Sequence, residues 1–207
     1  MASYTLPDLP YELTALEPHY SARALELHHA KHHQAYVDGA NKTIDALDKA
    51  RDDDDFSALG ALEKSLAFHV SGHLLHSVFW RTLSPDGGGA PEGELSDAIF
   101  EMFGSVERLK AQLSSATISL QGSGWGALHW EPMAERLIVT QVYDHQSNVA
   151  QSASPLLVID GWEHAFYLDH QTDKASWLDA FWAMVNWPEV ADRFALARNL
   201  TGIGAGR

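Results

Sequence analysis

Two helical patterns rich in histidine, separated by an acidic run, constrain the fold of this chain more than any other feature. The first pattern covers residues 21–50, where apolar, aromatic and histidine side chains recur every three or four residues: Leu25, His28, His32 and Tyr36. The second covers residues 57–83 and has the same spacing: Leu62, Leu66, His69, His73, His76 and Trp80. This spacing puts side chains on one face of a helix. Because residues 51–55 form a short polar break, we expect an antiparallel hairpin with histidines on its inner faces.

The residue pattern changes after the glycine- and proline-rich stretch at residues 84–91. Residues 94–119 predict one or two helices, with Gly104 and Ser105 as break and cap, and residues 177–185 and 189–199 are again helical in pattern. Residues 125–131, 137–143 and 156–160 are rich in β-branched and aromatic side chains and predict three strands. We expect an α+β fold: an N-terminal helical hairpin domain (residues 1–87), then a C-terminal α/β domain (residues 88–207) with a three-stranded antiparallel sheet.

The composition excludes several kinds of site and partner. The chain has no cysteine, so disulfides, thiolate metal sites and iron–sulfur clusters are excluded. Its net charge of −14 argues against nucleic acid and anionic membranes as partners. There is no apolar run of about eighteen residues and no signal-peptide pattern at the start. We therefore expect a cytoplasmic protein without a membrane or nucleic-acid partner.

The clustering of the histidines indicates a metal site. One histidine on a helix is usually a hydrogen-bonded core residue, but several on facing helices are costly to bury unless a partner satisfies them. Asp160 and His164 add a carboxylate and an imidazole where the third strand ends. Such a set accepts zinc, iron, manganese or copper. A zinc hydrolase would need Glu at position 29, which is His29, and a di-iron site would need repeated Glu-x-x-His. A mononuclear redox site fits better.

Five motifs support a more specific interpretation. They are residues 27–37 (LHHAKHHQAYV), 76–80 (HSVFW), 83–89 (LSPDGGG), 121–126 (QGSGWG) and 160–167 (DGWEHAFY). Together they resemble the iron/manganese superoxide dismutase family, and the resemblance extends from residues 4–9 to residues 186–187. One departure is Leu75, which stands where the family usually has Asn before the second histidine ligand.

The resemblance implies one iron or manganese ion per subunit, with a solvent molecule as fifth ligand. Its ligands are then His28 and His76 from the hairpin, with Asp160 and His164 from the third strand and the loop after it. The remaining inner-face histidines become packing residues or supports of the ligands. The resemblance also assigns His32 and Tyr36 to the substrate channel. It makes His145 the partner of the bound solvent.

The implied activity is a superoxide dismutase that converts superoxide to oxygen and hydrogen peroxide while the ion cycles between its trivalent and divalent states. Three neutral imidazoles and one carboxylate suit this cycle, because proton uptake by the solvent ligand cancels the charge of the electron. A non-catalytic metal-binding protein with the same fold is the alternative. A zinc hydrolase on an unrelated helical fold is a second rival.

The surroundings of the site are implied in the same way. Trp125 and Trp162 wall the cavity, with Trp80 nearby. Lys31 and Lys174 are candidates for a basic funnel that attracts the anionic substrate. The resemblance also implies a homodimer or homotetramer, with two interface residues: Glu163, which holds the partner's His164, and Tyr167.

Overall fold

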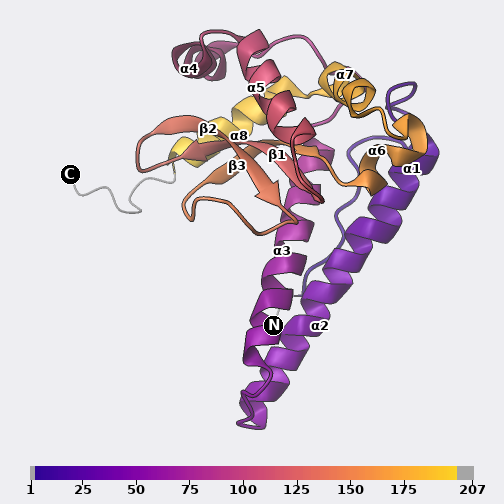
Figure 1. Ribbon diagram of the computed structural model, residues 1–207, viewed down its shortest axis with the longest axis vertical. Helices are drawn as coiled ribbons and strands as arrows, with labels where there is room; N and C mark the ends of the chain where they lie inside the picture. The colour runs from indigo at the N-terminus through magenta and orange to yellow at the C-terminus, as the bar shows by residue number, and fades with distance from the viewer. Residues whose placement is uncertain (1–2, 200–207) are drawn as a thin grey trace.

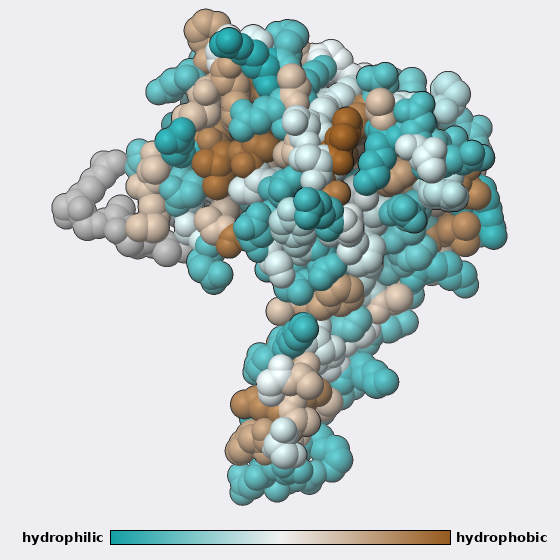
Figure 2. All heavy atoms as spheres, in the orientation of Figure 1, coloured by the Kyte–Doolittle hydropathy of each residue, from teal (hydrophilic) through white to brown (hydrophobic). Residues whose placement is uncertain are grey.

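The computed structural model describes residues 3–199 and joins a helical hairpin to an α+β body (Figure 1). The first arm of the hairpin consists of α1 (Ala22–Leu27), a π-helical turn η1 (His28–His33) and α2 (Gln34–Asp52). The second arm is α3 (Leu59–Arg81). The lower parts of α2 and α3 extend away from the body, as both the ribbon and the space-filling view show (Figures 1 and 2). The predicted α+β fold class is confirmed; residues 1–2 and 200–207 of the expected domains lie outside the described residues.

The first arm differs from the single continuous helix that the sequence predicts. Ser21 caps α1 as expected, since its hydroxyl accepts from the Ala24 N–H. From His28 the hydrogen bonds of the helix span five residues, and the N–H of Gln34 donates to the carbonyl of His29. This π-helical register brings His28 and His33 to full burial although they are five residues apart. A continuous α-helix would not align them, because its faces repeat every three or four residues.

The two arms touch closely where Gly39 of α2 meets His69 of α3. A Cβ at Gly39 would overlap the His69 imidazole, so any larger residue there would require the His69 ring to move. The second arm begins at Leu59, two residues after the predicted Ser57, and its cap position Ala58 offers no side-chain bond.

The body begins with α4 (Gly93–Phe103) and α5 (Val106–Ile118). The predicted break between them is confirmed, because Gly104 ends α4 at a φ of 82° and the Ser105 hydroxyl accepts from the Arg108 N–H. The sheet consists of β1 (Gly124–Glu131), β2 (Arg136–Tyr143) and β3 (Ser154–Asp160), all antiparallel in the order β2-β1-β3. Trp125 on the central strand pairs with Val142 on one side and Asp160 on the other. The pairing of β1 with β3 therefore places Asp160 beside Trp125.

The last part of the chain is helical, with α6 (Glu163–His170), α7 (Lys174–Met184) and α8 (Trp187–Asn199). The sequence reading missed α6 and treated its start as a loop. Trp162 occupies the cap position of α6 without a side-chain capping bond, so Glu163 in the first turn is the one local start signal of this helix. His164 consequently lies in the first turn of a helix, and its expected place in a loop is wrong.

The main core lies between the upper half of α3, the sheet and α7. Its largest fully buried side chains include Trp80, Phe79, Trp125, Trp177, Phe166 and Phe181. Burial of such aromatic surface is the main stabilising term of the fold. Within residues 3–199, none of the helices combines the length and apolar character needed to cross a membrane.

Candidate metal centre

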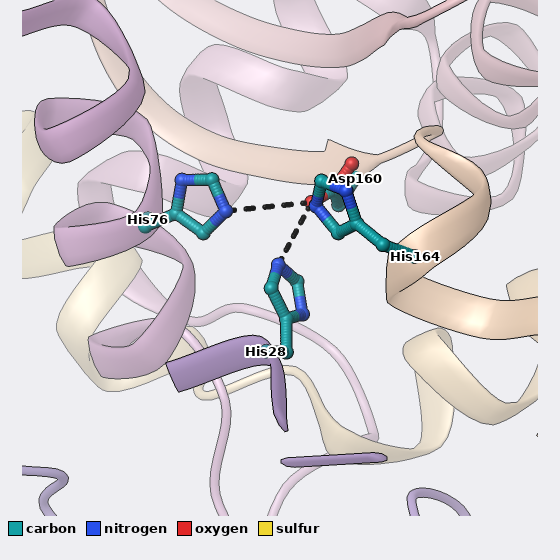
Figure 3. Close-up of side chains that lie close together, drawn as sticks. All are labelled: His28, His76, Asp160 and His164. Carbon is teal, nitrogen blue, oxygen red and sulfur yellow. Dashed lines mark ion pairs between the residues drawn. The ribbon is translucent and has the colours of Figure 1, made fainter. Parts of the chain in front are cut away.

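Four side chains from four separate elements converge inside the body (Figure 3). His28 comes from η1, His76 from α3, Asp160 from the last position of β3, and His164 from the first turn of α6. One potential ligand atom from each lies within 4.8 Å of the others. The structure thus brings together all four residues of the expected ligand set, although they lie far apart in the sequence.

The distances and the missing partners define a cavity for one ion. Asp160 Oδ2 lies 3.1 Å from the Nε2 of His28, 3.5 Å from that of His164 and 3.9 Å from that of His76. These four atoms are buried, and none has a hydrogen-bond partner among the residues that the structure describes. Orphaned buried polar atoms are costly. A cation at their centre would satisfy all four, so this donor set fits iron or manganese, which accept imidazole and carboxylate.

The electrostatics keep the ligand atoms in the forms that bind a cation. Burial lowers the pKa of His28 to about 4 and that of His76 well below its ordinary value, so both imidazoles are neutral near pH 7. Burial alone would raise the pKa of Asp160, but contacts with His164 and His28 hold it below its usual range. His28 and His76 therefore present neutral imidazoles, and Asp160 presents an ionised carboxylate.

Hydrogen bonds hold the ligand residues through atoms other than the four that converge. The Nδ1–H of His76 donates to the carbonyl of Gly72 at 2.6 Å, which leaves its Nε2 free. Asp160 Oδ1 accepts from the Trp162 N–H at 2.8 Å, and the carbonyl of Asp160 accepts from the Trp177 indole at 2.9 Å. Such supports orient ligands and tune the metal. The sequence reading missed Gly72 and Trp177, because no local pattern connects them with the site.

His145 lies beside this cavity, as expected. Its Nδ1 accepts from the Trp125 indole at 3.0 Å, so the neutral ring carries its proton on Nε2. That Nε2 is buried and has no hydrogen-bond partner in the described part of the chain. The His145 ring stacks on Trp162 at 4.6 Å and meets the Tyr36 ring edge-on at 4.5 Å. Burial lowers the pKa of His145 to about 4.

The two expected channel residues, Tyr36 and His32, occupy different settings. Tyr36 is buried, lies 5.0 Å from the His76 ring, and has its pKa raised, chiefly by burial. His32 is half-buried and stacks on His164 at 4.1 Å with its ring tilted by 14°. The sequence reading missed Phe68, whose ring lies 4.8 Å from His145 and 5.7 Å from Tyr36. Aromatic rings therefore enclose the cavity.

Two other inner-face histidines make hydrogen bonds outside the group of four ligand atoms. His33 accepts at Nδ1 from the Trp80 indole at 2.9 Å, and its Nε2 lies 2.7 Å from Nδ1 of His73. His29 Nε2 donates to the carbonyl of Pro7 at 2.8 Å. Leu75, which stands in place of the family's usual Asn, is buried in the core beside His76.

The residues expected at an interface and in a funnel lie near the surface. Glu163 is exposed, and Tyr167 has 50% of its surface accessible. Lys174 lines a pocket of about 350 Å³ together with Trp162 and Glu163, while Lys31 is exposed. The pocket is therefore lined by one basic side chain, Lys174, and one acidic side chain, Glu163, beside Trp162.

A helical hairpin packed on an α/β domain, with one buried site of three imidazoles and a carboxylate between them, defines a mononuclear metalloprotein. Two family models match the chain: the α-hairpin domain of iron/manganese superoxide dismutases over residues 3–84, and their C-terminal domain over residues 91–193. The chain belongs to the iron/manganese superoxide dismutase family. The resemblance seen in the five motifs is confirmed, and so is the enzymatic reading.

Similar proteins carry either metal in their names. The chain is 51% identical to a manganese superoxide dismutase of Nocardia asteroides, over 96% of each chain. It is 50% identical to a manganese/iron superoxide dismutase of Propionibacterium freudenreichii subsp. shermanii, over 95% of this chain and 99% of the relative. It is 48% identical to an iron superoxide dismutase of Mycobacterium tuberculosis, over 97% of each chain. The cofactor is accordingly iron or manganese, and a non-catalytic or hydrolytic role is not favoured.

Proposed function

We propose that this chain disproportionates superoxide at one iron or manganese ion held by His28, His76, Asp160 and His164. The observation that carries the proposal is the set of four buried ligand atoms within 4.8 Å of one another, which have no hydrogen-bond partner among residues 3–199. An ion held by these four residues would supply the redox chemistry, with one superoxide as the reductant and the next as the oxidant. The two superoxide ions and two protons yield oxygen and hydrogen peroxide.

His145 and Tyr36 handle the protons in this proposal. The Trp125 indole donates to Nδ1 of His145, so the proton of the neutral ring lies on Nε2, which has no other partner among the described residues and is the donor in this proposal. Tyr36 stays protonated because burial raises its pKa, so its hydroxyl offers a proton at the cavity wall. General acid catalysis of this kind requires donors within hydrogen-bond reach of the reacting oxygen. His32, half-buried against His164, is the residue that links the cavity with solvent.

The charge of the molecule opposes the approach of an anion, because the chain carries a net charge of −14. Local basic residues overcome such a field only near the entrance. Lys174 in its pocket beside Trp162 and the exposed Lys31 are the proposed guides of superoxide.

The assembly and location are further parts of the proposal. Glu163, Tyr167 and the exposed Leu168 lie on α6 beside the ligand His164, as a self-complementary contact near the site would require. A homodimer or homotetramer through this helix follows, with Glu163 reaching the partner's His164. The cytoplasmic location and the domain division at residue 87 stay predictions from the sequence.

The test uses the purified full chain, with metal content measured by mass spectrometry and superoxide consumption measured in parallel. We expect one iron or manganese ion per subunit and rapid consumption. His76→Ala should lose both, while His73→Ala, one turn away on the same helix, should keep the ion. Retention of one ion per subunit by His76→Ala would reject the ligand set, and a loaded but inactive wild-type protein would reject the activity.

A further inference from the structure

The ligand His28 is supported by a side chain that none of the sequence motifs contains. The hydroxyl of Tyr20 lies 2.7 Å from His28 Nδ1, on the edge of the ring opposite the cavity. Tyr20 is entirely buried and lies in the segment before α1. Its ring packs on Trp177 at 5.3 Å, and the Trp177 indole donates to the carbonyl of Asp160. Tyr20 therefore touches one expected ligand and the support of another.

The support of His28 differs in kind from that of His76. His76 is held by the carbonyl of Gly72, four residues earlier in its own helix, and a carbonyl can only accept. The corresponding partner of His28 is a hydroxyl from outside its helix. When Nε2 of His28 faces a cation, the proton of the neutral ring must lie on Nδ1, so Nδ1–H donates to Tyr20 Oη. The cation thus sets the tautomer, and the hydroxyl, which can accept this proton, fixes the rotation of the ring.

We infer that Tyr20 is a positioning residue for His28 and that Tyr20 and Trp177 together brace His28 against the Asp160 backbone. This inference rests on the proposed ligand role of His28. The brace joins three parts of the chain that are distant in sequence: the segment before α1, the end of β3 and helix α7. Its effect is to hold two ligand atoms, His28 Nε2 and Asp160 Oδ2, at a fixed separation of 3.1 Å.

Removal of the hydroxyl has a defined consequence. In Tyr20→Phe the ring volume is nearly conserved, but Nδ1 of His28 is left buried without its partner, so the imidazole loses its fixed orientation. Loss of such an outer contact typically lowers metal affinity by about 10–100-fold. The reduction potential of the bound ion should shift as well, because the hydroxyl contact makes His28 a stronger electron donor.

The experiment compares three variants of the full chain loaded with manganese. Metal affinity is measured by competition with a chelator, and the midpoint potential by spectroelectrochemical titration. Tyr20→Phe should bind manganese about 10–100-fold more weakly, with a shifted potential. Tyr11→Phe is the matched control, because it removes another buried hydroxyl, which donates to the Trp80 carbonyl at 3.1 Å and touches no ligand. Its affinity and potential should match those of the wild type.

His28→Ala separates the two levels of the argument. If His28→Ala retains manganese at wild-type affinity, the proposed ligand set fails. If His28→Ala loses manganese but Tyr20→Phe equals Tyr11→Phe in affinity and potential, only the positioning role fails. If Tyr20→Phe does not fold, nuclear magnetic resonance on the wild-type chain still tests the contact. In zinc-loaded, nitrogen-15-labelled protein, a slowly exchanging Nδ1–H of His28 close to the Tyr20 ring protons is expected, and its absence overturns the inference.

Discussion

Trp125→Phe tests the proposed role of His145 most directly. The Trp125 side chain is fully buried, its indole N–H donates to His145 Nδ1 at 3.0 Å, and its ring lies 4.9 Å from that of His76. Phenylalanine keeps the aromatic contact but removes the donor. The orphaned His145 Nδ1 costs about 1–3 kcal/mol, and the smaller ring leaves a cavity that adds about 1–2 kcal/mol. For a chain of this length, the sum lowers the melting temperature by on the order of 10 °C.

The kinetic effect should be larger than the loss of stability suggests. Without the indole donor, His145 can place its proton on either ring nitrogen, so Nε2 is no longer a dedicated donor toward the cavity. We expect superoxide turnover to fall by about 10–100-fold while one metal ion per subunit is retained. Turnover is measured by stopped-flow decay of superoxide at a temperature well below the melting point of the variant.

Trp182→Phe provides the control for loss of a tryptophan donor. Its indole donates to the Ser114 hydroxyl at 2.9 Å and contacts none of the proposed site residues. This variant should keep wild-type turnover per metal ion. Two results would refute the reasoning: wild-type turnover in Trp125→Phe, or an equal loss of turnover in both variants.

Three further outcomes are expected. Tyr36→Phe should retain the metal but lower turnover at high superoxide flux, which pulse radiolysis measures; unchanged kinetics would remove Tyr36 from the proton path. Glu163→Ala should weaken self-association in sedimentation velocity runs, and a profile identical to wild type contradicts the interface role. His129→Gln should reduce acid sensitivity. Burial lowers the pKa of His129 from 6.5 to about 4, so its contribution is complete above pH 6.5 and is lost as the pH falls toward 4. The loss reaches about 3 kcal/mol of unfolding free energy. When this free energy is measured by chemical denaturation at pH 7 and at pH 4, the difference between the two values should be smaller in His129→Gln than in wild type by about that amount.

The elements that the sequence predicted well are those with local signals. Gly104 and Ser105 mark a helix end and a helix start by their own backbone and side-chain chemistry, and the structure has both. The three strands are distinguished by β-branched and aromatic runs, and each lies within two residues of its predicted bounds. Local consistency of this kind is typical of natural sequences.

The features that escaped prediction depend on contacts between distant residues. Helix α6 begins at Glu163 without a capping side chain, and the bond of Trp177 to the Asp160 carbonyl joins two elements. Tyr20 lies outside every motif, and its meeting with His28 follows from the tertiary fold. Spacing alone also could not select His28 and His76 among the clustered histidines. The motifs selected them, and the converging side chains in Figure 3 supply the geometric reason.

The π-helical turn has a consequence for how this chain tolerates change. A π-helical turn closes its hydrogen bonds over five residues where an α-helix uses four, so it holds one residue more. Removal of one residue between His28 and His33 would leave these histidines four apart, a spacing that a continuous α-helix places on one face. The same removal inside α2 would rotate every residue that follows by about 100°. The length of η1 is therefore less strictly constrained than the length of the α-helix after it.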